Sequence, residues 1–315
     1  MNKKFNPFKN DIFPKFIKII GWDTIEDWSY FCEKNEFISM IESFKGNNFK
    51  EDWIWGILLP LLSQSYKICS SDKKRQIIGI SALPGTGKST LGLFLEKLSL
   101  KLNIKIKSIS IDDFYLPKEE MVLAVKDNPW NVSRGFPGSH STDLMKKKLY
   151  IWKETGELNV PIYDKSLNKG LGDRSYWIND RPDLVVIEGW FLGVRPFNIE
   201  INENENEKIY PPLSSKEKAY RLKIQNNLKE YIDIWKLVDM VWHLKPEKFN
   251  YLNLWKRQQE KDMLLKKGVC LSEENLVNFL RMLNTAIPQH SFDKIKSNFL
   301  FTIDQERKLI NLTSN

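Results

Sequence analysis

The chain has 315 residues, 42% of them hydrophobic and 28% charged, which is typical of a globular protein that buries a full core. Its formal net charge of +8 favours ligands that carry phosphate or carboxylate groups, although nucleic acid would suit the same charge. Because the lysines are spread along the chain and no RNA- or DNA-binding signature occurs, we expect small anionic ligands and no nucleic-acid partner.

Residues 1–70 are predicted to form a helical extension ahead of a main domain at 71–315. Four aromatic residues supply apolar faces between charged positions: Trp22, Trp28, Phe31 and Phe37. The longest apolar run, 53–62, has ten residues, whereas a membrane span needs about 20. The run therefore predicts a buried helix, and we expect no membrane association.

The first thirty residues lack a sustained apolar stretch and contain several acids, which argues against a secretory signal and against a transit peptide. The three cysteines, Cys32, Cys69 and Cys270, lie far apart and in no metal-binding spacing. This usage indicates free thiols in a reducing compartment, so we expect a cytoplasmic protein.

From residue 76 onward, short apolar strands alternate with helices. The predicted strands are 76–81, 104–111, 184–187 and 238–244, and the predicted helices are 91–102, 228–235 and 247–267. Residues 299–303 resemble a further strand that enters a turn at 304–307, and 200–207 are predicted to be a solvated loop. The alternation predicts an α/β fold with a largely parallel sheet flanked by helices.

A phosphate-binding loop is predicted between the first strand and the first helix. Ala82-Leu83-Pro84-Gly85-Thr86-Gly87-Lys88-Ser89 fits the P-loop pattern, with Ala82 where glycine is usual. The glycines let backbone N–H groups fold around phosphate oxygens. Lys88 is predicted to be an exposed loop side chain that reaches the β- and γ-phosphates, and Ser89 is predicted to bind Mg²⁺. The expected nucleotide contacts are Gly85, Thr86, Gly87, Lys88, Ser89 and Thr90. ATP is the expected nucleotide, because no guanine-reading Asn-Lys-x-Asp sequence occurs.

Carboxylates follow two of the predicted strands. Asp112 and Asp113 come directly after Ile111, and Glu188 comes directly after Ile187. Ligands in open α/β sheets bind at the carboxyl ends of the strands. A kinase that phosphorylates a hydroxyl needs one carboxylate near the acceptor oxygen and others to hold Mg²⁺. We expect the base to be Asp112 or Asp113, although Asp113 can instead cap the following turn, and we expect Glu188 to bind the metal.

Six segments after the phosphate-binding loop carry a family resemblance. In chain order they are 110–116, 134–140, 163–166, 172–174, 186–193 and 255–260. With them the chain resembles the superfamily of uridine kinase, phosphoribulokinase and pantothenate kinase, and within it the D-glycerate 3-kinases of plants, cyanobacteria and fungi. The resemblance covers about residues 76–305. It implies a P-loop NTPase fold and the ATP-dependent phosphorylation of the 3-hydroxyl of D-glycerate to 3-phosphoglycerate.

The resemblance also implies roles for individual residues. Asp112 takes the position of the presumed base, and the expected substrate contacts are Arg134, His140, Tyr163, Lys165 and Arg174. Because glycerate carries a carboxylate, a guanidinium is expected to pair with it, and Lys165 would add positive charge. Direct in-line transfer is expected, with no covalent enzyme intermediate.

Two positions depart from the family pattern. The family usually has an aspartate soon after the position of His140, and here Ser141 and Thr142 come before Asp143. It usually has arginine straight after the tryptophan, and here Lys256 comes before Arg257. We expect Arg257 to contact the nucleotide, with Lys256 as the alternative cation of the lid.

Two other functions fit the same motifs. One is another small-molecule kinase of the superfamily, acting on a nucleoside, pantothenate or a sugar phosphate. The other is a P-loop ATPase that serves as an assembly or nucleic-acid factor. The polar, glycine-rich stretch between Arg134 and Arg174 favours a kinase, and an assembly ATPase more often ends its central strand in Asp than in Glu.

Overall fold

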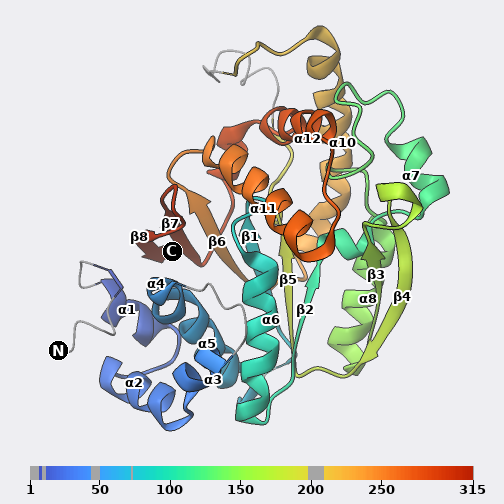
Figure 1. Ribbon diagram of the computed structural model, residues 1–315. Coiled ribbons are helices and arrows are strands. Elements are labelled where there is room, and N and C mark those ends of the chain that lie inside the picture. Colours follow the sequence, from blue (N-terminus) through green and yellow to red (C-terminus); the bar gives the residue numbers. More distant parts are fainter. Residues whose placement is uncertain (1–6, 9–11, 44–49, 72–73, 198–208, 315) are drawn as a thin grey trace.

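A six-stranded sheet runs through the centre of the computed structural model, which describes residues 7–8, 12–43, 50–71, 74–197 and 209–314 (Figure 1). The strand order is β2-β5-β1-β6-β7-β8, with the first five strands parallel and β8 antiparallel at the edge. The strands are β1 (Ile77–Ala82), β2 (Ile106–Ser110), β5 (Leu184–Gly189), β6 (Met240–Pro246), β7 (Phe299–Ile303) and β8 (Leu309–Ser314). The predicted α/β fold with a largely parallel sheet is therefore confirmed.

Two neighbouring interior strands of the sheet have the most continuous apolar sequence. β1 and β5 are buried along their whole length, as expected for parallel strands that are covered on both faces. β2 ends earlier than predicted, because the Ser110 side chain caps a 3₁₀ turn at Ile111–Phe114. This turn, rather than the strand itself, carries the two aspartates.

Helices cover both faces of the sheet. One face packs against α6 (Lys88–Ser99) and the N-terminal helices, in a core that includes Ile78 and Ile80. The other face packs against α8 (Thr142–Thr155), α10 (Ser215–Trp235) and α12 (Glu273–Thr285), in a core that includes Ile77. Successive residues of β1 thus enter opposite cores, as the pleat of a strand requires.

The predicted helical N-terminal region is confirmed. It consists of α1 (Ile12–Ile19), α2 (Ile25–Lys34), α3 (Phe37–Ser43), α4 (Glu51–Trp53) and α5 (Leu59–Cys69), with a π-helical turn at Ile54–Leu58. The apolar run 53–62 falls in this last part and is almost entirely buried. On α1, the Phe16 ring lies 5.6 Å from the Trp242 ring of β6 and 5.0 Å from the Phe299 ring of β7. The helices therefore share a core with the sheet, and a domain boundary at residue 70 stays a prediction.

A two-stranded antiparallel hairpin, β3 (Leu158–Asp164) and β4 (Asp173–Asp180), lies outside the main sheet. Most of the hairpin falls in the polar, glycine-rich stretch between Arg134 and Arg174, as does α8, whereas α7 (Lys118–Ala124) precedes that stretch. Lys165 directly follows β3, and Arg174 lies in β4. The hairpin matters for the site because it packs against the 3₁₀ turn that carries Asp112.

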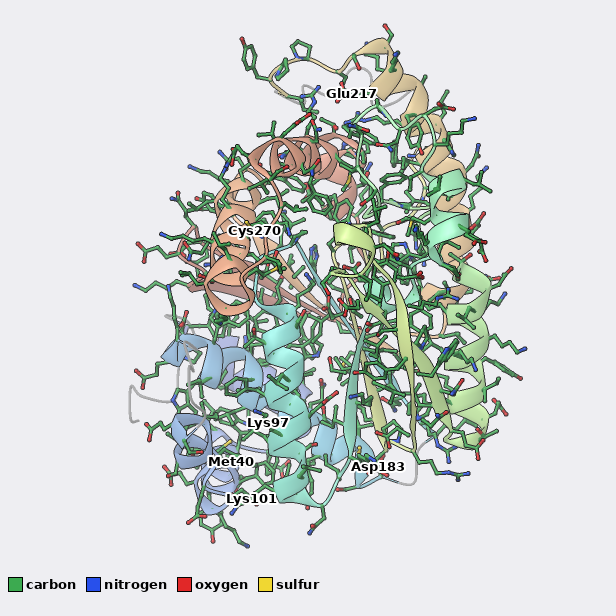
Figure 2. The ribbon with its side chains drawn as sticks, turned by 45° about the vertical axis from the view of Figure 1, so that its right-hand side comes forward. Met40, Lys97, Lys101, Asp183, Glu217 and Cys270 are labelled. Carbon is green, nitrogen blue, oxygen red and sulfur yellow. The ribbon has the colours of Figure 1, made fainter. Side chains whose placement is uncertain are left out.

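The long helix α10 is fixed at its N-terminus by a capping box between Ser214 and Glu217. Glu217, labelled in Figure 2, also accepts a hydrogen bond of 2.7 Å from Arg281 of α12. This ion pair links the start of α10 to α12.

No helix in the described part of the chain is long and apolar enough to cross a membrane. All three cysteines are free, as predicted. The predicted loop 200–207 lies outside the described residues.

Candidate active site

The predicted P-loop joins β1 to α6. Gly85 and Gly87 have φ angles of +76° and +114°, in the left-handed region that favours glycine. A Cβ atom on Gly85 would lie 2.6 Å from the backbone carbonyl of Trp255, which belongs to α11 (Tyr251–Lys267). Glycine is therefore needed both for the turn and for the close packing of α11 on the loop.

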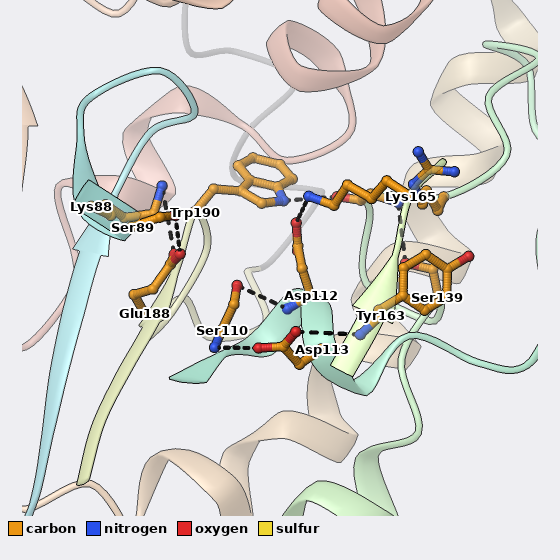
Figure 3. Close-up of polar contacts among 12 residues, drawn as sticks. Lys88, Ser89, Ser110, Asp112, Asp113, Ser139, Tyr163, Lys165, Glu188 and Trp190 are labelled. Atoms are coloured by element: carbon orange, nitrogen blue, oxygen red, sulfur yellow. Dashed lines mark hydrogen bonds and ion pairs between the residues drawn. The ribbon is translucent and has the colours of Figure 1, made fainter. Parts of the chain in front are cut away.

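Lys88, Ser89 and Glu188 meet at the start of α6 (Figure 3). The Ser89 hydroxyl donates a hydrogen bond of 2.7 Å to Oε1 of Glu188, and Nζ of Lys88 lies 3.8 Å from Oε2 of the same carboxylate. Lys88 is buried, and not the exposed loop side chain that the sequence suggested, because it begins the helix beneath the loop. Burial lowers its pKa, and the nearby Glu188 opposes that shift.

The donor set beside Lys88 suits Mg²⁺. This ion prefers oxygen ligands, and the Ser89 hydroxyl and the Glu188 carboxylate already lie within hydrogen-bonding distance of each other. The two residues could hold the ion beside phosphate groups cradled by the loop. Their role as metal ligands stays a prediction.

Asp112 faces two side chains from distant parts of the chain. Its Oδ2 atom accepts a hydrogen bond of 2.7 Å from Nζ of Lys165, and its Oδ1 atom lies 3.8 Å from Nε2 of His140. Burial alone would raise the pKa of Asp112, but the Lys165 ammonium and His140 hold it well below its ordinary value. Asp112 is therefore an ionised carboxylate at neutral pH.

Asp113 is used differently, although it is the next residue. Its Oδ2 atom accepts a hydrogen bond of 2.9 Å from the backbone N–H of Ser110, and its Oδ1 atom accepts one of 3.4 Å from the backbone N–H of Tyr163. Burial raises its pKa to about 6. Figure 3 shows its carboxylate turned toward these backbone groups and Asp112 turned toward Lys165. The geometry favours Asp112 as the carboxylate available to a ligand.

The two predicted carboxylate-binding arginines hold loops together. Arg134 donates hydrogen bonds of 2.9 and 2.7 Å to the carbonyls of Gly170 and Leu171. Arg174 donates one of 3.1 Å to the carbonyl of Tyr115 and one of 2.6 Å to the hydroxyl of Ser141. Because a guanidinium has five N–H donors, these contacts leave some donors for a ligand, and substrate binding by either arginine stays a prediction.

Tyr163 and Lys165 reach the site from the β3–β4 hairpin. The Tyr163 hydroxyl donates a hydrogen bond of 3.0 Å to the carbonyl of Leu171. Lys165 is half-exposed, and its pKa is raised because the attraction of Asp112 outweighs the effect of burial. Among the predicted substrate contacts, Lys165 is thus a cation that directly touches the candidate base.

The lid cations lie on different sides of α11. Arg257 forms an ion pair of 2.7 Å with Glu273 of α12 and is half-exposed, so its guanidinium is engaged at the surface. Lys256 is nearly buried, with Nζ 2.6 Å from Glu260 and 5.1 Å from the centre of the Phe279 ring. Burial lowers the pKa of Lys256, and Glu260 opposes that shift. A contact of Arg257 with the nucleotide stays a prediction.

Arg307, in the turn after β7, was missed by the sequence analysis. Its Nε atom donates a hydrogen bond of 2.8 Å to the carbonyl of Gly85 in the P-loop, and its guanidinium lies 5.5 Å from the centre of the Trp255 ring. Its φ angle of +62° is uncommon for a residue other than glycine. No motif marks this arginine, and the predicted turn at 304–307 was the only signal near it.

Replacing Lys165 with Met should move the low-pH limb of kcat/KM to higher pH. Without the ammonium, the Asp112 carboxyl group keeps its proton up to a higher pH, and a protonated Asp112 cannot accept a proton from the acceptor. The measurement is a pH profile of kcat/KM. Lys146→Met is the matched control, since Lys146 forms an ion pair of the same 2.7 Å length with Asp233 at the surface. An unshifted limb for Lys165→Met would contradict the electrostatic role of this lysine.

Comparisons with known proteins relate the chain to kinases. No protein-family model matches the chain. An uncharacterized kinase of Schizosaccharomyces pombe is 30% identical over 232 residues, which are 69% of this chain and 80% of that protein. The chloroplastic D-glycerate 3-kinase of Arabidopsis thaliana is 32% identical over 217 residues, which are 65% of this chain and 45% of that enzyme. The solved structure of D-glycerate 3-kinase from Cryptococcus neoformans is 25% identical, with a TM-score of 0.68, and covers 81% of this chain and 99% of that one.

Proposed function

Because the chain belongs to the P-loop kinase superfamily and is an ATP-dependent kinase, we propose that it phosphorylates the 3-hydroxyl of D-glycerate to give 3-phosphoglycerate. The observation that carries the proposal is the contact of Asp112 with Lys165. It sets a carboxylate that can accept a proton beside a cation that can attract an anionic acceptor. The similarity to D-glycerate 3-kinases supports the choice of acceptor.

The acceptor would bind between the P-loop and the β3–β4 hairpin. Lys165 is half-exposed, so it can leave Asp112 to pair with the carboxylate of glycerate. Arg134 and Arg174 would supply the remaining charge from the loops that they stabilise, with His140 and Tyr163 nearby. The net charge of +8 favours an acid over a neutral acceptor.

In the proposed reaction, Asp112 accepts the proton of the 3-hydroxyl as that oxygen forms a bond to the γ-phosphorus of ATP. The bond between the γ-phosphorus and the bridging oxygen breaks in the same step, and ADP leaves with the electron pair. Lys88 stabilises the charge that develops on the phosphoryl oxygens. Mg²⁺, held by Ser89 and Glu188, would neutralise phosphate charge when it is bound.

The remaining nucleotide contacts would come from the loop itself. The backbone N–H groups of Gly85, Thr86, Gly87 and Thr90 belong to the loop and to the first turn of α6, where the helix dipole favours an anion. In the proposed function Lys256 replaces Arg257 as the lid cation, because Lys256 is the nearly buried one of the two. We place this kinase domain at 71–315 and expect the protein to act in the cytoplasm.

An ATP-consumption assay with D-glycerate, L-glycerate, uridine, pantothenate and ribulose 5-phosphate tests the proposal. We expect D-glycerate to be the preferred acceptor and phosphorus NMR to identify 3-phosphoglycerate as the product. A main product of 2-phosphoglycerate would contradict the regiochemistry, and a preference for another acceptor would mean a different small-molecule kinase. ATP consumption that does not depend on any acceptor would indicate the ATPase alternative.

A further inference from the structure

His140 is held rigidly beside Asp112. Its backbone forms a β-bridge with Tyr115, and its ring stacks on the Tyr115 ring at 4.4 Å. The Phe191 ring packs against it edge-on at 5.7 Å, and the imidazole is completely buried. A ring that is enclosed in this way cannot turn over easily, so its two nitrogen atoms keep distinct surroundings.

The Nδ1 atom of His140 lies 2.8 Å from its hydrogen-bond partner, the hydroxyl of Tyr231. The same Tyr231 oxygen accepts a hydrogen bond of 3.2 Å from the backbone N–H of Gly138. If Nδ1 carried a proton and donated a hydrogen bond to the Tyr231 oxygen, the buried Tyr231 O–H group would have no acceptor among the described residues. If Nδ1 is bare, the hydroxyl donates a hydrogen bond to it, and both Nδ1 and the hydroxyl are satisfied.

The Nε2 atom points the other way. It is buried, has no hydrogen-bond partner among the described residues, and lies 3.8 Å from Oδ1 of Asp112. A bare nitrogen lone pair would repel the ionised carboxylate, whereas an N–H group is attracted to it. Burial also lowers the pKa of His140 despite the opposing effect of Asp112, which favours the neutral ring. Both ends of the imidazole therefore favour a proton on Nε2.

We propose that Tyr231 is a positioning residue that fixes the tautomer of His140, so that the Nε2–H group faces Asp112, the carboxylate that deprotonates the acceptor. The inference rests on the proposed role of Asp112 as the base. Because the Nε2 atom is buried, its N–H group would act on the Asp112 carboxylate, which lies 3.8 Å away, and not on the acceptor itself. This attraction would hold the Asp112 carboxylate ionised and in a fixed orientation before transfer.

The helix α10 supplies the rigidity that this role requires. Asn227, one turn before Tyr231, donates a hydrogen bond of 2.9 Å from its side chain to the carbonyl of Pro137. Gly138 has a φ angle of +101°, and a Cβ atom there would lie 2.0 Å from the Asn227 amide nitrogen. Two adjacent turns of one helix thus hold both the loop that carries His140 and the ring of His140 itself.

Tyr231→Phe tests the proposal, with Tyr220→Phe as the matched control. Both tyrosines are buried on α10, but the Tyr220 hydroxyl has no hydrogen-bond partner among the described residues. For Tyr231→Phe we expect kcat to fall roughly 10-fold, as for the loss of about one hydrogen bond, with an unchanged KM for ATP. For Tyr220→Phe we expect both values to be unchanged. Thermal melting of both variants shows whether the fold is kept.

The tautomer is measured directly by long-range nitrogen–proton NMR of the ¹⁵N-histidine-labelled protein. The chain has only three histidines, and the signals that disappear in His140→Gln identify His140. In the wild-type protein and in the Tyr220→Phe variant, we expect the His140 proton to be on Nε2. In the Tyr231→Phe variant, we expect part of the population to carry it on Nδ1. This NMR measurement requires no acceptor, so it tests the tautomer even if D-glycerate proves to be the wrong substrate. In that case the kinetic measurements use the acceptor that the ATP-consumption assay identifies.

Three results would overturn the proposal. The first is a wild-type His140 that carries its proton on Nδ1, which is decisive even if Tyr231→Phe does not fold. The second is a Tyr231→Phe variant that keeps wild-type kcat. The third is a lower kcat with an unchanged tautomer, because that would mean that Tyr231 only stabilises the loop.

Discussion

Replacing Lys88 with Ala is expected to lower kcat by about 1,000-fold or more. The Lys88 ammonium lies at the start of α6 beside the P-loop, where it can stabilise charge that builds up on the transferring phosphoryl group. Removing one preorganised donor of this kind costs roughly 100- to 1,000-fold, and cations on transferring phosphates cost up to about 100,000-fold. Steady-state kinetics with saturating ATP and acceptor measure the loss.

The stability of this variant needs its own measurement, because Lys88 is buried beside Glu188. Glu188 keeps the Ser89 hydroxyl as a partner in the variant, so we expect a folded protein with a shifted Tm. Lys97→Ala, at the exposed far end of the same helix (Figure 2), is the matched control and should keep wild-type kcat. Wild-type turnover in a folded Lys88→Ala variant would mean that the loop is not a phosphate site.

Replacing Asp112 with Asn is expected to lower kcat roughly 100- to 10,000-fold, with little change in the KM for ATP. The amide has the size of the carboxylate but cannot accept the proton of the acceptor hydroxyl. Higher pH should not restore activity. Higher Mg²⁺ should not restore it either, whereas substantial recovery with Mg²⁺ would make Asp112 a metal ligand instead of a base.

Asp113→Asn is the control at the neighbouring position. The Asp113 carboxylate accepts hydrogen bonds from two backbone N–H groups, and one oxygen of an asparagine amide can still accept one of them. We expect this variant to lose some thermal stability and to keep most of its kcat. A large loss at Asp113 with near-normal turnover at Asp112 would mean that the base has been assigned to the wrong aspartate.

Local patterns predicted five of the six strands of the main sheet and missed the edge strand β8. The strands β1 and β5 are continuous apolar runs, and such runs are recognisable without knowledge of their neighbours. The β3–β4 hairpin was missed because Pro161 interrupts its first strand and because Tyr176 and Trp177 of its second strand are exposed. An irregular pattern of this kind gives no clear signal with period two.

The candidate site could be predicted only where its residues are close in sequence. The P-loop is one continuous motif, whereas Lys165 and Asp112 touch across 53 residues, and Tyr231 and His140 across 91. Tyr231 has the spacing of an ordinary core residue of an amphipathic helix, so nothing in the sequence marks its hydroxyl. Arg257 and Lys256 are adjacent, and only the packing of α11 decides which of them is nearly buried.

The contact of α1 with the far end of the chain has a consequence for biosynthesis. The Phe16 ring packs against Trp242, Phe299 and Phe301, which are translated more than two hundred residues later. Contacts of such large sequence separation form late, since a long loop must close before they add any stability. On the ribosome, the Phe13 ring of α1 can pack on Trp28 of α2, but the Phe16 ring has none of these partners until β6 and β7 have emerged. During that interval the nascent chain exposes the surface that chaperones bind.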